Sequence, residues 1–242
     1  MNKKNVEVVR DAGALASRAA EKFIEIAHQA IERQGAFSVA LSGGSTPKKL
    51  YELLASPDFR EQLDWEQIHF FFGDERNVPP DSDESNFKMA DSAMFSRLKE
   101  LPATNIHRVP GEAAAADAAN EYEQLLKDFF QNELPRFDLI LLGMGPDGHT
   151  ASLFPESPAL TENARWFVEN WVEKFSAYRL TLTFPVINNA ANVLFLVAGS
   201  DKAVVLNEVL HGAENKYPSQ KINPLDGELI WLLDRAAAGE KG

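Results

Sequence analysis

Short apolar segments alternate with amphipathic helical segments along most of this chain. FDLILLG (137–143) and NVLFLVAG (192–199) read as buried strands, as does FSVAL (37–41). Residues 15–31 carry an apolar side chain at every fourth position, and DKAVVLNEVL (201–210) also has a helical pattern. Buried strands that alternate with helices are typical of a parallel sheet covered on both faces. The sequence therefore predicts an α/β fold with a mainly parallel sheet.

The remaining segments follow the same rhythm. The stretch 73–81 is rich in Gly, Pro and Asp and is expected to be a loop that directly follows a strand. No Pro-, Gly- or Ser-rich linker and no internal repeat divides the chain, so a single domain over residues 1–242 is expected. Further strands are expected at 68–72, 178–184 and 228–234, and further helices from Pro47, over 87–98 and over 113–130.

A Gly-rich turn, SGGSTP (42–47), joins the expected strand 37–41 to the helix that begins near Pro47. Such a turn places unpaired backbone N–H groups and the positive end of a helix dipole around one point, which suits an anion. The turn has neither the Gly-Lys-Ser/Thr of a Walker A loop nor a GxGxxG fingerprint. The alternative is a tight structural turn with an ordinary Ser or Thr cap.

The segment GMGPDGHT (143–150) follows another buried strand and holds Asp147 close to His149. A carboxylate beside an imidazole can fix the tautomer of the ring and raise its basicity, which suits a general base that works near neutral pH. The alternative is a capping Asp and a polar loop His. Of the five His residues in the chain, His149 stands in the Gly-rich frame. A metal site is not expected, because no second His or Cys lies at ligand spacing.

Four further charged residues follow or open strands. Asp74 and Arg76 could form an acid/base site, although a structural ion pair is the more common role of such a cluster. Arg179 opens a strand and Lys202 lies in a strand-to-helix turn, where each alone would count as a solvated cation. A parallel sheet would bring both toward the 42–47 turn. Because open α/β sheets bind ligands at the carboxyl ends of their strands, we expect one site at this edge.

Charge and composition exclude several classes of protein. The chain has 24 Lys and Arg against 36 Asp and Glu, a formal net charge of −12, which opposes generic binding to nucleic acid or an anionic membrane. The absence of Cys excludes disulfides, thiol nucleophiles and Cys-ligated metals. The polar N-terminus does not resemble a signal peptide, and no apolar run reaches the ~18 residues that span a bilayer. A soluble cytoplasmic protein is expected.

Taken together and in order, these segments resemble the 6-phosphogluconolactonase family. The resemblance extends from about residue 38 to residue 237, and the pieces that carry it are ALSGGSTPKKLY, FFGDERNVPPDSDESNFKMA, LILLGMGPDGHTASLFP, RLTLTFPVIN, FLVAGSDKA and GELIWLLDRAA. It implies a Rossmann-like three-layer α/β/α fold of the glucosamine-6-phosphate deaminase-like superfamily. It also implies hydrolysis of 6-phospho-D-glucono-1,5-lactone, the second step of the oxidative pentose phosphate pathway.

The resemblance also implies roles for individual residues. His149 is expected at the lactone as general acid and base, oriented by Asp147, with Arg76 and Asp74 on the sugar side of the substrate. No metal and no organic cofactor are expected, and the partner is a small sugar-phosphate lactone bound by a monomer or a homodimer. The residues expected to bind the phosphate or the ring are Gly43, Gly44, Ser45, Thr46, Arg179 and Lys202.

Two other functions are weighed against the lactonase. Glucosamine-6-phosphate deaminases resemble this chain but carry a catalytic Glu a few residues after the His, at the position of Phe154 here. Without that carboxylate, proton transfer in an aldose–ketose deamination loses a partner. A non-catalytic sugar-phosphate sensor is the second alternative. Such a regulator would need a DNA-binding module, for which the chain has neither spare length nor a basic segment, and would have no use for the Asp147–His149 pair.

Overall fold

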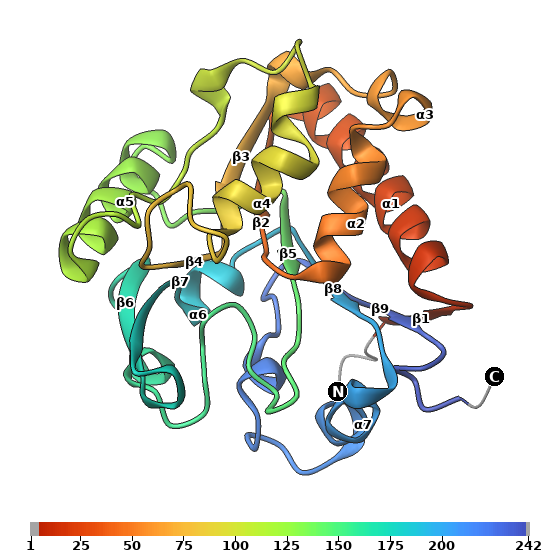
Figure 1. Cartoon of the computed structure of the whole chain (residues 1–242), viewed down its shortest axis with the longest axis vertical. Helices are drawn as coiled ribbons and strands as arrows, with labels where there is room; N and C mark the ends of the chain where they lie inside the picture. Colours follow the sequence, from red (N-terminus) through yellow and green to blue (C-terminus); the bar gives the residue numbers. More distant parts are fainter. Residues whose placement is uncertain (1–4, 241–242) are drawn as a thin grey trace.

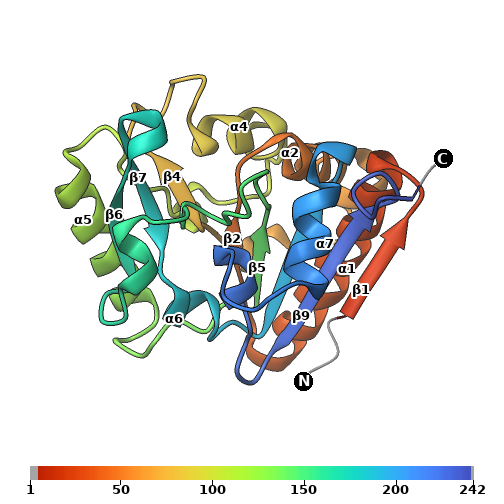
Figure 2. The same cartoon turned by 90° about the horizontal axis from the view of Figure 1, so that it is seen from below.

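A six-stranded sheet, parallel throughout, forms the centre of the computed structural model, which describes residues 5–240. The strand order is β1-β9-β8-β5-β2-β3 (Figures 1 and 2). This confirms the predicted α/β fold with a mainly parallel sheet. The strands are β1 (Asn5–Val9), β2 (Phe37–Leu41), β3 (Ile68–Phe72), β5 (Leu139–Leu142), β8 (Asn192–Val197) and β9 (Glu228–Asp234).

The inner strands are apolar because helices cover both faces of the sheet. Every residue of β2 and β5 is buried. Figures 1 and 2 show β9 between helices α1 and α7, which lie on opposite faces. Among residues 5–240, no helix has the length and apolar character needed to cross a membrane. The helices are α1 (Ala12–Gln34), α2 (Ser45–Leu54), α3 (Pro57–Arg60), α4 (Asn86–Ala93), α5 (Ala115–Phe129), α6 (Phe184–Ile187) and α7 (Ala203–His211).

A second sheet lies beside the first and was not predicted. Its three antiparallel strands, in the order β4-β7-β6, are β4 (Asp74–Arg76), β7 (Ala177–Leu182) and β6 (Phe167–Val172). The expected loop 73–81 therefore begins with a strand, and the expected strand 178–184 lies in this antiparallel sheet and not in the parallel one. Strands β1 and β6 were also missed. The short strand β4 is charged and has no apolar pattern that would predict a strand. It forms because it pairs with β7.

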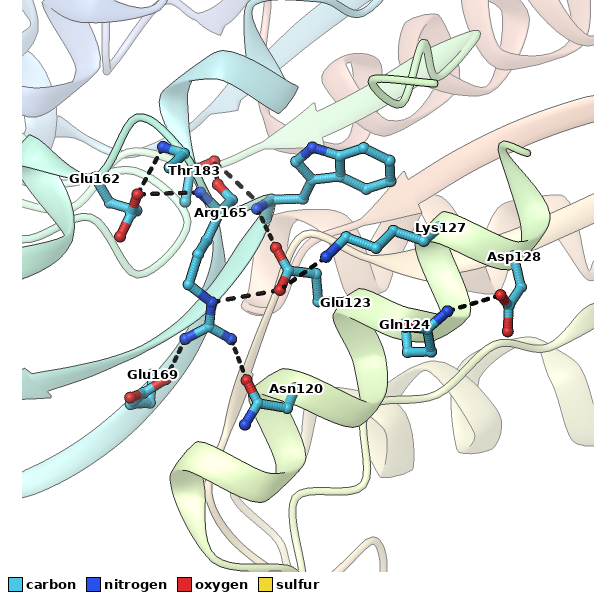
Figure 3. A network of polar contacts seen from close by, with 11 residues as sticks. Asn120, Glu123, Gln124, Lys127, Asp128, Glu162, Arg165, Glu169 and Thr183 are labelled. Atoms are coloured by element: carbon cyan, nitrogen blue, oxygen red, sulfur yellow. Dashed lines mark hydrogen bonds and ion pairs between the residues drawn. The ribbon is translucent and has the colours of Figure 1, made fainter. Parts of the chain in front are cut away.

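Helix α5 is fastened to this second sheet by polar contacts (Figure 3). The buried carboxylate of Glu123 on α5 accepts from the backbone N–H of Trp166 at 2.7 Å and from Arg165 Nε at 3.4 Å. Arg165 also donates to Asn120 on α5 and to Glu169 on β6. Because Glu123 is buried, its partners offset the desolvation of its charge. The network therefore ties α5 to β6 and to the segment that leads into β6.

The rings of His69 on β3 and His107 pack against aromatic side chains. His69 Nδ1 lies 3.3 Å from His107 Nε2, and the His107 ring stacks on Phe71 at a centroid distance of 4.3 Å. Burial, together with the charge of His69, lowers the pKa of His107 from 6.5 to about 4. The unfolded chain therefore takes up a proton at a higher pH than the folded protein does. The free energy of unfolding therefore falls as the pH drops from 6.5 toward 4, because protonation of His107 favours the unfolded chain.

We expect His107→Phe to reduce this acid sensitivity, because a phenyl ring keeps the stacking and cannot take up a proton. The free energy of unfolding, measured in urea at about pH 7 and about pH 4.5, should fall less in the variant than in the wild type. His28→Gln serves as the control, since His28 lies on α1 with an exposed ring whose Nε2 is 2.7 Å from the backbone carbonyl oxygen of Gln62. An equal loss in His107→Phe and the wild type would contradict the role given to His107.

Candidate functional site

The carboxyl ends of neighbouring strands meet around one cavity. From β2 the chain continues to β3 on one side, while β5 lies on the other side of β2, so the direction of strand addition changes between β2 and β5. Ligands bind at such a switch point in open α/β sheets. A cavity of about 210 Å³ opens there. Its lining comes from the loops after β2 and β5, from β4 and from the start of α4: Ser42, Gly43, Gly44, Asp74, Arg76, Asn86, Gly143, Met144, Gly145, His149 and Ala151.

The turn after β2 presents the N-terminus of α2 to this cavity. Gly44, with φ of 106°, is the N-cap residue and supplies no side-chain cap, so the first N–H groups of α2, at Ser45 and Thr46, point out of the helix without an intrahelical acceptor. The hydroxyl oxygen of Ser42 is buried and has no hydrogen-bond partner within the described part of the chain. These donors and the helix dipole make the turn suitable for an anion.

Gly43 is required in this turn because the side chain of Asn86 occupies the space beside it. A Cβ at residue 43 would lie 2.0 Å from Asn86 Oδ1. Asn86 is almost fully buried and donates from Nδ2 to the carbonyl oxygen of Asp74 at 2.9 Å. It lines the cavity but was not predicted, since nothing in its local sequence distinguishes it from any helix-starting Asn.

The loop after β5 holds His149 against Asp147. His149 Nδ1 lies 2.5 Å from Asp147 Oδ1, and backbone bonds from Gly145 N to His149 O (2.9 Å) and from Gly148 N to Gly145 O (3.0 Å) close the loop. The hydrogen bond with His149 holds the pKa of Asp147 well below its ordinary value, although burial opposes this. Nδ1 is engaged by Asp147 and His149 lines the cavity, so Nε2 is the ring nitrogen left for a substrate. This arrangement suits a general base.

The aromatic ring of Phe154 covers one face of the imidazole. The His149 and Phe154 rings stack at a centroid distance of 4.0 Å and an interplanar angle of 28°. Phe154 is buried. The position that was compared with the catalytic Glu of the deaminases therefore presents an apolar surface to His149, and it offers no second carboxylate for proton transfer.

The second sheet supplies charged residues on the far side of the cavity. Asp74 is buried and its Oδ2 accepts from Ser152 Oγ at 2.7 Å. Arg76 lines the cavity, donates to the carbonyl oxygen of Glu84 and lies opposite Arg179 in the β4–β7 register. Burial, and then the charge of Arg76, lowers the pKa of Arg179 from its ordinary value. Two guanidinium groups on neighbouring strands repel one another, so an anion between them would be stabilised.

Glu75 has a structural task beside these residues. Its carboxylate accepts from the backbone N–H groups of Asn86 (2.8 Å) and Phe87 (2.8 Å) at the start of α4, and from Arg76 N at 2.7 Å. Burial raises the pKa of Glu75. It thus caps α4 and ties the segment between β4 and α4 to the site, a role that the sequence did not reveal.

Lys202 lies apart from the cavity lining. Its Nζ contacts Asp201 Oδ2 at 2.8 Å in the turn after β8. That turn begins at the carboxyl end of a strand next to β5, as expected, but the side chain is paired locally. Asp147 supports His149 from behind and lines a separate groove. Within residues 5–240, no group of three or more His, Cys, Asp or Glu side chains is placed to hold a metal ion.

Comparison with known proteins agrees with this geometry. The model of the glucosamine-6-phosphate isomerase/6-phosphogluconolactonase family matches residues 10–231. The chain belongs to this family. A 6-phosphogluconolactonase from Nostoc sp. is 45% identical over 98% of both chains. The solved structure of 6-phosphogluconolactonase from Trypanosoma cruzi has a TM-score of 0.87 at 32% identity and covers 98% of this chain and 96% of its own. The predicted family resemblance is therefore confirmed.

A solved deaminase structure has the same fold, so the fold alone does not distinguish a lactonase from a deaminase. The solved structure of a monomeric glucosamine-6-phosphate deaminase has a TM-score of 0.81 at 21% identity and covers 98% of this chain and all of its own. At that identity the likeness concerns the fold. The architecture alone therefore does not separate the two reactions.

Proposed function

We propose that this chain hydrolyses 6-phospho-D-glucono-1,5-lactone to 6-phosphogluconate. The observation that carries the proposal is that His149, held by Asp147 at 2.5 Å, lines the same cavity as the Gly43–Gly44 turn that leads into α2. A base and an anion-binding turn are what hydrolysis of a phosphorylated lactone requires. The names of the relatives, which include 6-phosphogluconolactonases at 37–48% identity, support this reaction. Residues 1–242 would act as one catalytic domain.

The reaction begins when neutral His149 accepts a proton from water at Nε2 while the water oxygen attacks the lactone carbonyl. The carbonyl becomes a tetrahedral oxyanion, which a nearby cation or backbone N–H stabilises. The imidazolium, held by Asp147, then returns its proton to the ring oxygen as the carbon–oxygen bond breaks. General acid–base catalysis contributes about 10²–10⁴-fold and one oxyanion donor about 10²–10³-fold. No step calls for a metal or an organic cofactor.

The phosphate would bind at the turn after β2. Gly43 and Gly44 allow a close approach, and Ser45 and Thr46 at the start of α2 add backbone and hydroxyl donors. The phosphate lies far from the reacting carbon, so its binding energy holds the lactone in register for attack. We place Arg76 and Asp74 beside the sugar ring.

The cations Arg76, Arg179 and Lys202 can be assigned by kinetics. Substitution of a residue that grips the phosphate should raise KM by about tenfold or more with kcat nearly unchanged, because a charge-assisted hydrogen bond is lost in both ground and transition states. We expect this result for Arg179→Ala. Steady-state kinetics on fresh lactone measure it, and Arg33→Ala at the opposite end of the sheet is the control. A fall in kcat at unchanged KM would instead place Arg179 at the carbonyl.

Two substrates separate the lactonase from the deaminase. The chain is incubated in parallel with fresh lactone and with glucosamine 6-phosphate, and 6-phosphogluconate and ammonia are measured. We expect phosphogluconate above the spontaneous background and no ammonia, since Phe154 stands where a deaminase needs a carboxylate. Ammonia release would overturn the proposal in favour of the deaminase. Binding of 6-phosphogluconate without turnover of either substrate would favour a sensor.

We also propose that the protein works in the cytoplasm on a free sugar phosphate. The formal net charge of −12 disfavours polyanions and anionic membrane surfaces, while the local donors of the cavity can still bind one small anion.

A further inference from the structure

A short turn of the second sheet reaches across to the Asp147–His149 pair. The turn η5 (Glu173–Phe175) joins β6 to β7, whereas Asp147 and His149 follow β5 of the large sheet. Lys174 Nζ lies 3.2 Å from Asp147 Oδ2. Asp147 therefore uses one carboxylate oxygen for His149 and the other for Lys174. This contact connects the two sheets directly behind the imidazole.

The residue after Lys174 supports the other side of the same imidazole. The ring of Phe175 meets Phe154 edge to face at a centroid distance of 5.6 Å, and Phe154 stacks on His149. The turn thus braces both groups that hold the His149 ring: the carboxylate in its plane and the aromatic ring on its face.

We propose that Lys174 is a positioning residue that holds Asp147 from the opposite sheet and balances its charge, so that the His149 ring stays oriented toward its task. The inference rests on the proposed role of His149 as the base. It goes further because it assigns a positioning role to a residue of the β6–β7 turn, where the sequence has no recognisable motif.

The sign of the effect follows from the charges around the ring. Asp147 favours the imidazolium, and the ammonium of Lys174 opposes it. Removing the ammonium should therefore move the acidic limb of the kcat/KM profile to higher pH. The other charged groups near the pair are Asp74 and Arg76 across the cavity, Arg179 next to Arg76, and Glu156 and Glu173 in the groove behind Asp147; all stay unchanged in the variants.

The size of the effect is modest because the Lys174 side chain is 59% exposed. Screened by solvent, one charge at this range should shift the titration of His149 by about 0.3–0.5 pH unit. Lys174→Glu should shift it further in the same direction than Lys174→Met, and Lys174→Arg should restore the wild-type value. At about 1 M salt the wild type and Lys174→Met should converge, because screening removes the contribution of an exposed charge.

The test is an NMR titration of the His149 ring in the free protein, with the signal assigned through His149→Ala. Lys99→Met, which removes an exposed lysine outside the cavity lining, controls for the change in net charge. A shift that follows the order Arg, Met, Glu at position 174 supports the inference, because loss of packing alone would not follow charge. A His149 titration that stays unmoved in both Lys174→Met and Lys174→Glu overturns it.

Kinetics then separate this inference from the proposed function. The acidic limb of kcat/KM for lactone hydrolysis should move with the NMR value in each variant. The substrate phosphate titrates identically in all variants, so the difference between profiles reports the enzyme. If the NMR titration moves while the kinetic limb stays in place, Lys174 does control His149, and His149 is not the base.

Discussion

His149→Ala should lower kcat for lactone hydrolysis by about 10²–10⁴-fold and leave the fold intact. The imidazole is the group that accepts the proton of water, and alanine offers no acceptor in its place. The side chain is 24% exposed and its main contacts are with Asp147 and Phe154, so its loss removes little of the core. Initial rates, corrected for spontaneous hydrolysis, measure the effect, and circular dichroism with thermal melting verifies the fold.

A second histidine provides the matched control for this variant. His28 lies on α1, and we expect His28→Ala to retain wild-type kcat and KM. A folded His149→Ala protein that turns over the lactone at a near-normal rate would show that another group activates the water.

Gly145→Ala should reduce kcat by about 10²-fold or more, although the substituted residue has no chemical role of its own. A Cβ at this position would lie 2.1 Å from both Nδ1 and Cε1 of His149 and 2.9 Å from Asp147 Oδ1. Either the imidazole or the loop must move, and a displacement of about 1 Å at a reacting group can cost 10²-fold in rate. Steady-state kinetics measure the loss, and the His149 ring signal in NMR reports whether the Asp147 contact persists.

Gly13→Ala is the control for a methyl group added elsewhere. A Cβ at Gly13, at the start of α1, would lie 3.3 Å from Asp11 Oδ1 and touch no residue of the site. We expect wild-type kinetics from this protein. If Gly145→Ala also retained wild-type kcat, the close packing of the loop beneath the imidazole would not matter for catalysis.

The sequence was informative where burial alone determines structure. The apolar runs of β2, β5 and β8 identify strands covered on both faces, and a parallel sheet places their polar loops at one edge. For this reason the sequence alone was enough to expect His149 and the Gly43–Gly44 turn at a common site. Several Gly residues in a short segment indicate a tight loop with an unusual backbone conformation, so the segment 143–150 could be recognised as a candidate site loop.

Contacts between distant segments were not predictable in this way. Strand β4 forms only because β7 pairs with it, and the sequence of Asp74–Arg76 resembles a loop. Asn86 reaches the cavity because Glu75 caps α4, and Lys174 reaches Asp147 because the β6–β7 turn points back at the large sheet. Such placements depend on pairing between residues far apart in the chain, which neither periodicity nor a local motif records.

The central claim, that this chain hydrolyses a phosphorylated lactone through a base and without a metal, is tested most directly by one rate. Freshly prepared 6-phosphogluconolactone is added to the protein in EDTA, and 6-phosphogluconate is followed by coupling to 6-phosphogluconate dehydrogenase. We predict a rate above the spontaneous background that is proportional to protein concentration and unaffected by EDTA. The absence of any protein-dependent rate, in a protein that still binds 6-phosphogluconate, would contradict the claim.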